Sequence, residues 1–142
     1  MRYKGVCLDF HSSWGLLLGV EVGLRLLRFP TLVALLEKGG LPARPTSRAQ
    51  PMSPPRAAYL VEIAARYSLA RPTCLKKSLV LYALLRKAGI AAKLVIGTTA
   101  PQSGFRAHAW VEAAGRIFGG EGAGKYAPLA SFAASGTEQQ IA

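Results

Sequence analysis

The sequence is poor in cysteine, histidine and aspartate. Its 142 residues include two cysteines and two histidines, and the single aspartate is Asp9. Two cysteines cannot build the disulfide framework of a small secreted domain, and the first residues lack the pattern of a signal peptide. We therefore expect a cytoplasmic protein. The clusters of ligating side chains that hold metal ions are also missing, so neither a metal nor a cofactor is expected.

No apolar run is both long and free of charge. Three charged residues interrupt the most apolar stretch, residues 14–36, and a proline breaks it: Glu21, Arg25, Arg28 and Pro30. Each charge would cost roughly 2.5–3.5 kcal/mol at the centre of a bilayer. We therefore expect a buried or surface-lying helix here, and no stable insertion into a membrane.

Acidic residues are scarce, which leaves a net charge of +11. Such a charge favours acidic partners, and nucleic acid is one of them. The basic residues are scattered, however, with pairs such as Lys76-Lys77 and Arg86-Lys87 instead of long runs. No zinc-finger spacing, recognition helix or aromatic RNA-binding motif accompanies them. An acidic peptide or protein is the expected partner, and nucleic acid is not.

The composition predicts one folded domain with an extension. Hydrophobic residues make up 51% of the chain, which is more than a disordered chain contains. Prolines cluster between residues 41 and 55 and mark the only candidate boundary. We predict an N-terminal helical extension and Pro-rich linker over residues 1–55, and a core over 56–142. Within the extension, residues 14–38 have helical spacing, which Pro30 divides into two helices.

Helices precede strands in the predicted core. One helix is expected over about residues 55–68 and a second over 74–88. Beyond them, β-branched residues from about 91 predict a strand, and the segment 105–118 predicts a hairpin with a tight turn at 114–115. No strand is predicted in the Ala/Gly-rich tail. A β-hairpin that follows helices indicates an α+β fold.

Cys74 opens the second predicted helix. The thiolate is the attacking form of cysteine, and a helix N-terminus stabilises negative charge through its unpaired N–H groups and dipole. On a helical wheel Cys74 shares the inward stripe with Ser78 and Leu81, which places the sulfur where the core meets a cleft. Thr73 is the predicted N-cap, and the Cys74 amide is a candidate oxyanion donor. Free cysteine is also among the most buried residue types, so a structural role stays open.

His108 lies in the first strand of the predicted hairpin. An imidazole can deprotonate a thiol and later protonate the leaving amine. His108, Trp110 and Glu112 point to one face of the strand, and alanines and Val111 to the other. A histidine packed in the core is the alternative interpretation. Together, Cys74 and His108 predict a Cys-His hydrolase.

A third residue would fix the tautomer of the imidazole. If residues 114–115 form a two-residue turn, the strand register places Glu121 opposite His108 on the same face. Glu121 is therefore the candidate. A bulge at Gly119-Gly120 would shift this register by one residue, so an exposed glutamate without a catalytic role stays open.

Several short motifs occur in the order and spacing of a known family. They are Pro-Thr-Cys-Leu at 72–75, Leu-Leu-Arg-Lys-Ala-Gly-Ile at 84–90, Leu-Val-Ile-Gly-Thr at 94–98 and Phe-Arg-Ala-His-Ala-Trp-Val-Glu at 105–112. With these motifs the chain resembles, over about residues 56–130, the transglutaminase-like B2 proteins of lasso-peptide maturation. Segment 24–30 is similar to the N-terminal helices of that family. The resemblance implies a papain/transglutaminase-like core, in which a nucleophile helix packs on a small antiparallel sheet.

The resemblance also implies an activity. It implies a cysteine protease that removes the leader peptide from a ribosomally made lasso-peptide precursor, with Cys74 as nucleophile and His108 as general base. The family places an Asp about twelve residues after the His, where this chain has Gly120 followed by Glu121. The implied partners are the precursor's leader peptide, a small leader-recognition protein and the ATP-using macrolactam cyclase.

Two alternatives stay open. A cysteine hydrolase or amide transferase that acts on another peptide would use the same Cys-His chemistry. A non-catalytic interaction module would keep the fold and lose the chemistry, and the missing Asp motivates this interpretation. Neighbouring reading frames for a precursor, a recognition protein and a cyclase would favour the lasso-peptide function.

Overall fold

The computed structural model describes residues 15, 17–23, 25, 26, 28, 31, 52–68, 72–99 and 104–133. These residues form an α+β fold, as predicted, in which helices precede a four-stranded antiparallel sheet. The expected break at Pro30, most of the helix expected after it and most of the Pro-rich linker lie outside the described residues.

Two helices precede the sheet and pack against each other. Helix α3 spans Pro54–Arg66 and α4 spans Cys74–Lys87, close to the two predicted helices. A proline suits the first turn of α3, where its missing N–H would have no partner in the helix. Thr73 caps α4, because its side-chain oxygen accepts a hydrogen bond from the N–H of Lys76 at 3.4 Å. The predicted N-cap is therefore confirmed, and Cys74 is the first residue of its helix.

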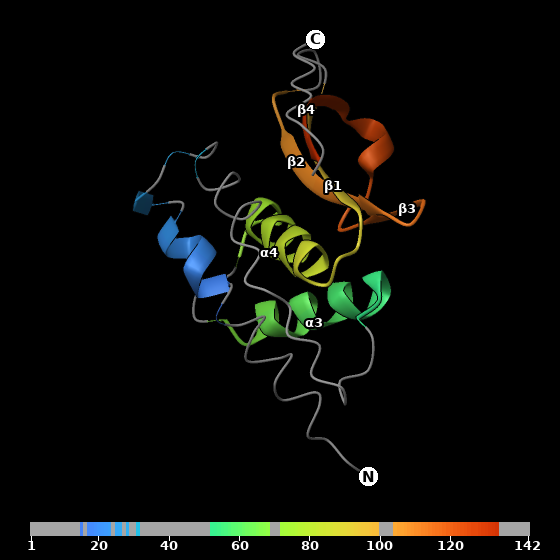
Figure 1. The fold of residues 1–142 in the computed structure, drawn as a ribbon. Coiled ribbons are helices and arrows are strands. Elements are labelled where there is room, and N and C mark those ends of the chain that lie inside the picture. The colour runs from blue at the N-terminus through green and yellow to red at the C-terminus, as the bar shows by residue number, and fades with distance from the viewer. Residues whose placement is uncertain are drawn as a thin grey trace, which may run out of the picture.

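Helix α4 lies between α3 and the sheet (Figure 1). Residues 78–85 of α4 are all buried, which explains why apolar side chains occupy consecutive positions there. Apolar side chains from α3 and from the sheet complete the core around it: Ala57, Val61, Ala64, Leu94, Val111 and Ala113. Residues 17–23 are helical and add Leu17 and Val20 to the same core. The helix of the N-terminal extension thus packs directly on the predicted catalytic core.

The sheet has the strand order β3-β2-β1-β4. The strands are β1 (Ala92–Thr98), β2 (Ala107–Ala113), β3 (Arg116–Phe118) and β4 (Ala127–Ala133). The first three agree with the predicted strands. Strand β4 lies in the tail where no strand was predicted, and it pairs with β1 with a shift in register between Ile96 and Gly97.

The turn between β2 and β3 has two residues, as expected. Ala114 and Gly115 both have positive φ, 50° and 70°, which is the pattern of a type I′ hairpin turn. Ala113 pairs with Arg116, which confirms the predicted start of the register. The pairing ends at Phe118, the last residue of β3. The edge of β2 beside His108 therefore has no β3 partner.

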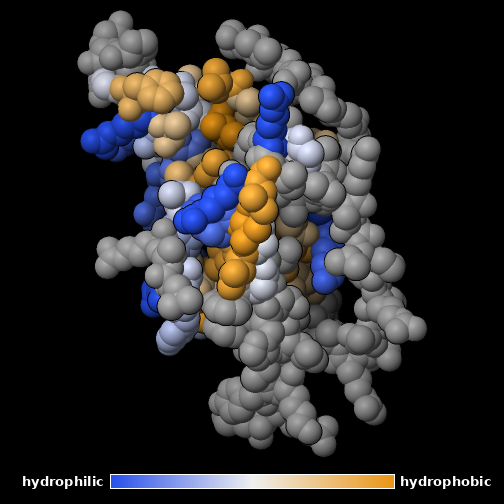
Figure 2. All heavy atoms as spheres, turned by 90° about the vertical axis from the view of Figure 1, so that its left-hand side faces the viewer, coloured by the Kyte–Doolittle hydropathy of each residue, from blue (hydrophilic) through white to orange (hydrophobic). Residues whose placement is uncertain are grey.

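The outer face of the N-terminal helix carries an apolar stripe. Leu18, Val22 and Leu26 follow each other at intervals of about one turn and are 46%, 47% and 77% exposed. Figure 2, which views this side of the molecule, shows hydrophobic surface next to strongly hydrophilic side chains. Within the described ranges, no helix combines the length and the hydropathy that are needed to cross a membrane.

Candidate active site

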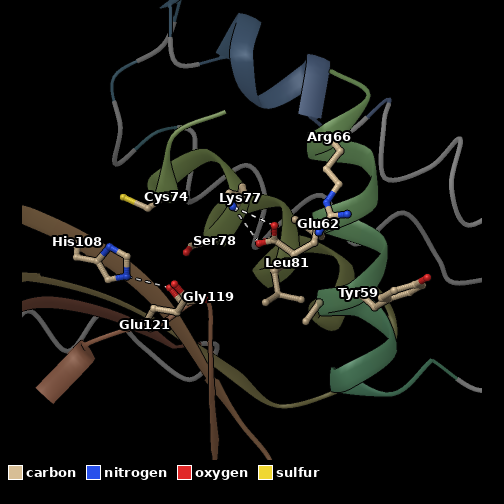
Figure 3. A pocket seen from close by; sticks show the side chains of 12 residues that line it. Tyr59, Glu62, Arg66, Cys74, Lys77, Ser78, Leu81, His108, Gly119 and Glu121 are labelled. Carbon is tan, nitrogen blue, oxygen red and sulfur yellow. Dashed lines mark hydrogen bonds and ion pairs between the residues drawn. The ribbon is translucent and has the colours of Figure 1, made fainter. Parts of the chain in front are cut away.

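One cavity of about 500 Å³ has Cys74, His108 and Glu121 on its wall. Residues of α3 and α4 form one side of this cavity, and β2 and the residues after β3 form the other (Figure 3). The structure thus brings together three residues that are up to 47 positions apart (121 − 74 = 47) in the sequence.

Cys74 is a half-buried, free thiol at the start of α4. The first N–H groups of a helix have no partner within the helix, so the dipole and the amides of the first turn favour negative charge at this position. Two lysines follow in the same turn. Lys76 forms an ion pair with Glu21, and Lys77 lies 3.0 Å from a carboxylate oxygen of Glu62. These pairs tie the first turn of α4 to the N-terminal helix and to α3.

His108 has a defined hydrogen-bond partner. Its Nε2 atom lies 2.9 Å from the main-chain oxygen of Gly119. Its ring also stacks with two aromatic rings, with centroid distances of 5.2 Å to Tyr126 and 6.3 Å to Trp110. Figure 3 shows the second ring nitrogen on the side of the ring that faces Cys74. These contacts hold the imidazole in one orientation at the edge of the cavity.

Cys74 and His108 face the same cavity without a direct contact. In the described part of the chain no hydrogen bond joins the sulfur of Cys74 to either nitrogen of His108. Catalytic hydrogen bonds are often long or poorly aligned until substrate binds. The lack of a direct hydrogen bond in this structure is therefore compatible with a catalytic pair.

Glu121 lies on the cavity wall, but not opposite His108 in a strand pair. The extrapolated register is wrong beyond Phe118, because β3 ends there and Gly119 turns the chain with φ +69°. Glu121 is exposed and has no hydrogen bond or ion pair to any other described residue. The partner of the imidazole is the carbonyl of Gly119 and not the carboxylate of Glu121.

Gly120 stands where the resemblance implies an Asp. A Cβ at this position would overlap Cγ2 of Ile117 and would lie 3.2 Å from Cβ of Ala123 and 3.3 Å from Cβ of Trp110. The chain after β3 is thus folded tightly over Trp110, which is only 3% exposed. The backbone found here leaves no space for a side chain at residue 120.

The family model of the transglutaminase-like superfamily matches residues 14–131. The chain belongs to this superfamily. The match extends from the N-terminal helix into β4 and includes the whole cavity. The superfamily includes cysteine proteases, and its fold commonly occurs in cysteine hydrolases and transferases. Comparisons with curated proteins and with solved structures gave no match.

The role of one residue of this transglutaminase-like site was not predicted from the sequence. Ser78, one turn after Cys74, is 3% exposed, and its hydroxyl donates a hydrogen bond of 2.9 Å to the main-chain oxygen of Ala109. Since Ala109 directly follows His108, this bond ties the helix of the thiol to the strand of the imidazole. The signal in the sequence was a polar residue on the inward stripe of Cys74, because a buried hydroxyl needs a hydrogen-bond partner.

The transglutaminase-like cavity combines the groups that acyl transfer requires. It presents a thiol at a helix N-terminus, an imidazole and main-chain N–H groups. Among the described residues, no three side chains of the His, Cys, Asp or Glu type lie close enough to hold a metal ion. The wall itself is apolar at Ala58, Val61 and Leu81, and charged at the rim through Glu62 and Arg66.

Proposed function

We propose that the chain is a cysteine peptidase that removes the leader peptide from a lasso-peptide precursor. Cys74 is the nucleophile and His108 the general base. The observation that carries the proposal is the shared cavity: a thiol at the start of a buried helix faces an imidazole that a hydrogen bond holds in place. Membership of the transglutaminase-like superfamily supports the cysteine chemistry. The order and spacing of the motifs around Cys74 and His108 support the lasso-peptide substrate.

The chemistry follows from the positions of the two residues. His108 takes the proton of the thiol, and the thiolate attacks the carbonyl carbon of the scissile peptide bond. The N–H of Cys74, in the first turn of α4 where amides have no partner within the helix, is the proposed donor to the oxyanion. The imidazolium then gives its proton to the leaving nitrogen, the C–N bond breaks, and the leader remains as a thioester on Cys74. Water, deprotonated by His108, hydrolyses the thioester to a carboxylic acid and restores the thiol.

Glu121 contributes charge in this proposal. Glu121 lines the same cavity as His108 and forms no ion pair with any described cation. A negative charge there stabilises the imidazolium that exists between the two proton transfers. Because the side chain is exposed, solvent screens this effect, and we expect it to be smaller than that of either Cys74 or His108.

The leader-recognition protein and the macrolactam cyclase are the two remaining proposed partners. We propose that the leader-recognition protein presents the leader, and that the cyclase uses the amine that cleavage exposes. The positive net charge of +11 suits an acidic surface on the leader or on the recognition protein.

The test is cleavage of the precursor in the presence of the recognition protein, followed by mass spectrometry. The wild-type chain is expected to release a core peptide with a free N-terminal amine. Cys74→Ala and His108→Ala are each expected to abolish this product, because one removes the nucleophile and the other removes the base. The other cysteine and histidine provide matched controls, and Cys7→Ala and His11→Ala should cleave as the wild type does.

Two results would contradict the proposal. Product formation by Cys74→Ala at the wild-type rate would end the role of the thiol. Failure of the wild-type chain to cut the precursor, with hydrolysis or amide transfer on unrelated peptides, would leave the second candidate function. That second candidate, a cysteine hydrolase or amide transferase with another peptide substrate, is favoured only by the range of activities in the superfamily.

A further inference from the structure

The hydrogen bond between His108 and Gly119 fixes where the proton of the neutral imidazole resides. A carbonyl oxygen can only accept a hydrogen bond. The Nε2 atom of His108, 2.9 Å from this oxygen, must therefore donate. In the neutral ring the other nitrogen, Nδ1, then carries the lone pair. This is the nitrogen that faces Cys74 in Figure 3, so the general base and its lone pair are on the side of the thiol.

The carbonyl reaches His108 because of the conformation of Gly119. Strand β3 ends at Phe118, and Gly119 follows with φ +69°, in the left-handed region that side chains disfavour. The space around this residue is not limiting, since a Cβ would lie 3.7 Å from Oγ of Ser78, an ordinary contact. Glycine is thus needed here for its backbone conformation and not for its size.

The surroundings keep the ring in line with this carbonyl. Tyr126 and Trp110 stack with His108. Gly97, which pairs with His108 across β1 and β2, leaves room for the indole, because a Cβ there would lie 2.8 Å from Cη2 of Trp110. Ser78 anchors the next residue of β2 to α4. Rotation of the imidazole away from Gly119 would break its ring contacts with Tyr126 and Trp110.

We propose that Gly119 is the positioning residue of this site and that its main-chain carbonyl takes the place of the carboxylate that usually orients the imidazole. The inference rests on the proposed roles of Cys74 and His108. The proton of the thiol goes to Nδ1 and from there to the leaving nitrogen, while Nε2 keeps its proton and its hydrogen bond to Gly119 throughout. An orienter that belongs to the backbone explains how the site is complete with glycine at residue 120.

The test reads the tautomer directly, by ¹⁵N NMR of the histidine side chains at a pH at which the ring is neutral. The His11→Ala protein identifies the signals of His108. In the wild type we expect the Nε2–H tautomer to dominate. In Gly119→Ala the strained backbone should withdraw the carbonyl, so that the Nδ1–H tautomer appears. The turnover of precursor should fall by about 10- to 100-fold with little change in KM, as part of what a general base contributes.

Two further variants separate the effect of the backbone conformation at residue 119 from the effect of adding a side chain there. Gly119→Asn should retain more of the Nε2–H tautomer and of the turnover than Gly119→Ala, because asparagine tolerates the left-handed region better than alanine. Gly115→Ala introduces the same strain at φ +70° in the β2–β3 turn, away from the cavity. It should leave both the tautomer and the turnover as in the wild type.

Glu121→Ala is the decisive comparison. With Gly119 as the orienter, the tautomer of His108 stays Nε2–H in Glu121→Ala. A shift of the tautomer in Glu121→Ala, or an unchanged tautomer in Gly119→Ala, would overturn the inference. The NMR readout needs no substrate, so failure of the wild type to cut the precursor would reject the proposed function and leave the role of Gly119 to be judged by the tautomer.

Discussion

The two sides of the cavity hold their reactive groups by different means. The helical side fixes Cys74 through side chains, namely the cap by Thr73 and two ion pairs in the first turn of α4. The opposite side holds His108 through the main-chain carbonyl of Gly119, next to the closely packed Gly120, and through ring contacts with Tyr126 and Trp110. A side chain contact can be lost singly, whereas a main-chain contact is lost only when the local backbone moves.

This difference predicts different tolerances to mutation. On the helical side three separate contacts position one turn, and each is at least partly exposed, so each contributes little by itself. On the side of His108 a few glycines set the path of the chain after β3. We therefore expect substitutions there to have larger effects than substitutions of the charged or capping residues. The following predictions test this comparison from the largest expected effect to the smallest.

The largest effect is expected for Gly120→Asp, which introduces the residue implied by the resemblance. The new side chain would collide with Ile117 and crowd Ala123 and Trp110. Crowding of this kind costs about 1–3 kcal/mol of unfolding free energy. Unfolding in urea, followed by tryptophan fluorescence, measures the change.

Gly124→Asp is the matched control, since residue 124 lies four positions further on, in the 3-10 helix Ala123–Lys125, and has no atom within 4 Å of an added Cβ. Its unfolding free energy should stay within about 0.5 kcal/mol of the wild type. A Gly120→Asp protein as stable as this control would show that the backbone after β3 adapts easily. The contrast between the two sides of the cavity would then fail.

Much of the helical side could be predicted from the sequence, because its signals are local. The Pro-Thr-Cys start, the cap at Thr73 and the inward stripe from Cys74 all follow from helix geometry. The hairpin turn at 114–115 was also predictable. Strand β4, with sequence Ala-Pro-Leu-Ala-Ser-Phe-Ala, was missed, since it has a proline and no polar alternation and forms only against β1.

The side of His108 was harder to predict for a physical reason. Every residue has a carbonyl, so the type of side chain at residue 119 cannot show that its oxygen serves the imidazole. The pair Gly119-Gly120 indicated an irregular backbone after β3, but it did not indicate where the carbonyl of Gly119 points. Extrapolation of the β2–β3 register reached Glu121 only because it ignored the end of β3 at Phe118. Side-chain patterns thus revealed the thiol and the base, and the structure was needed for the group that orients the base.

A smaller effect is expected for Thr73→Ala on the helical side. The variant removes the acceptor for the N–H of Lys76, and loss of such a cap costs about 0.5–2 kcal/mol. Because the bond is long at 3.4 Å, we expect a value in the lower half of this range. Thr73→Ser keeps the acceptor and should unfold at nearly the wild-type urea concentration. If Thr73→Ala lost as much unfolding free energy as Gly120→Asp, the two sides of the cavity would be equally sensitive to substitution, and the comparison would fail.

The smallest effect, and one that depends on pH, is expected for Glu21. The hydrogen bond from Lys76 lowers the pKa of Glu21 below its ordinary value of 4.5, the charges of Lys76 and Arg25 act in the same direction, and burial opposes them. The unfolded chain therefore binds this proton more readily, so the stabilisation is complete above about pH 4.5 and disappears as the pH falls through the lower pKa of the folded state. Urea midpoints of wild type and Glu21→Gln should differ by a constant amount at neutral pH and converge in acid.

Glu62→Gln, which removes the other carboxylate paired with this turn of α4, is the control for loss of an ion pair alone. A wild-type advantage that grew as the pH fell would contradict the assignment of the charge to Glu21, and with it one of the three contacts that position Cys74.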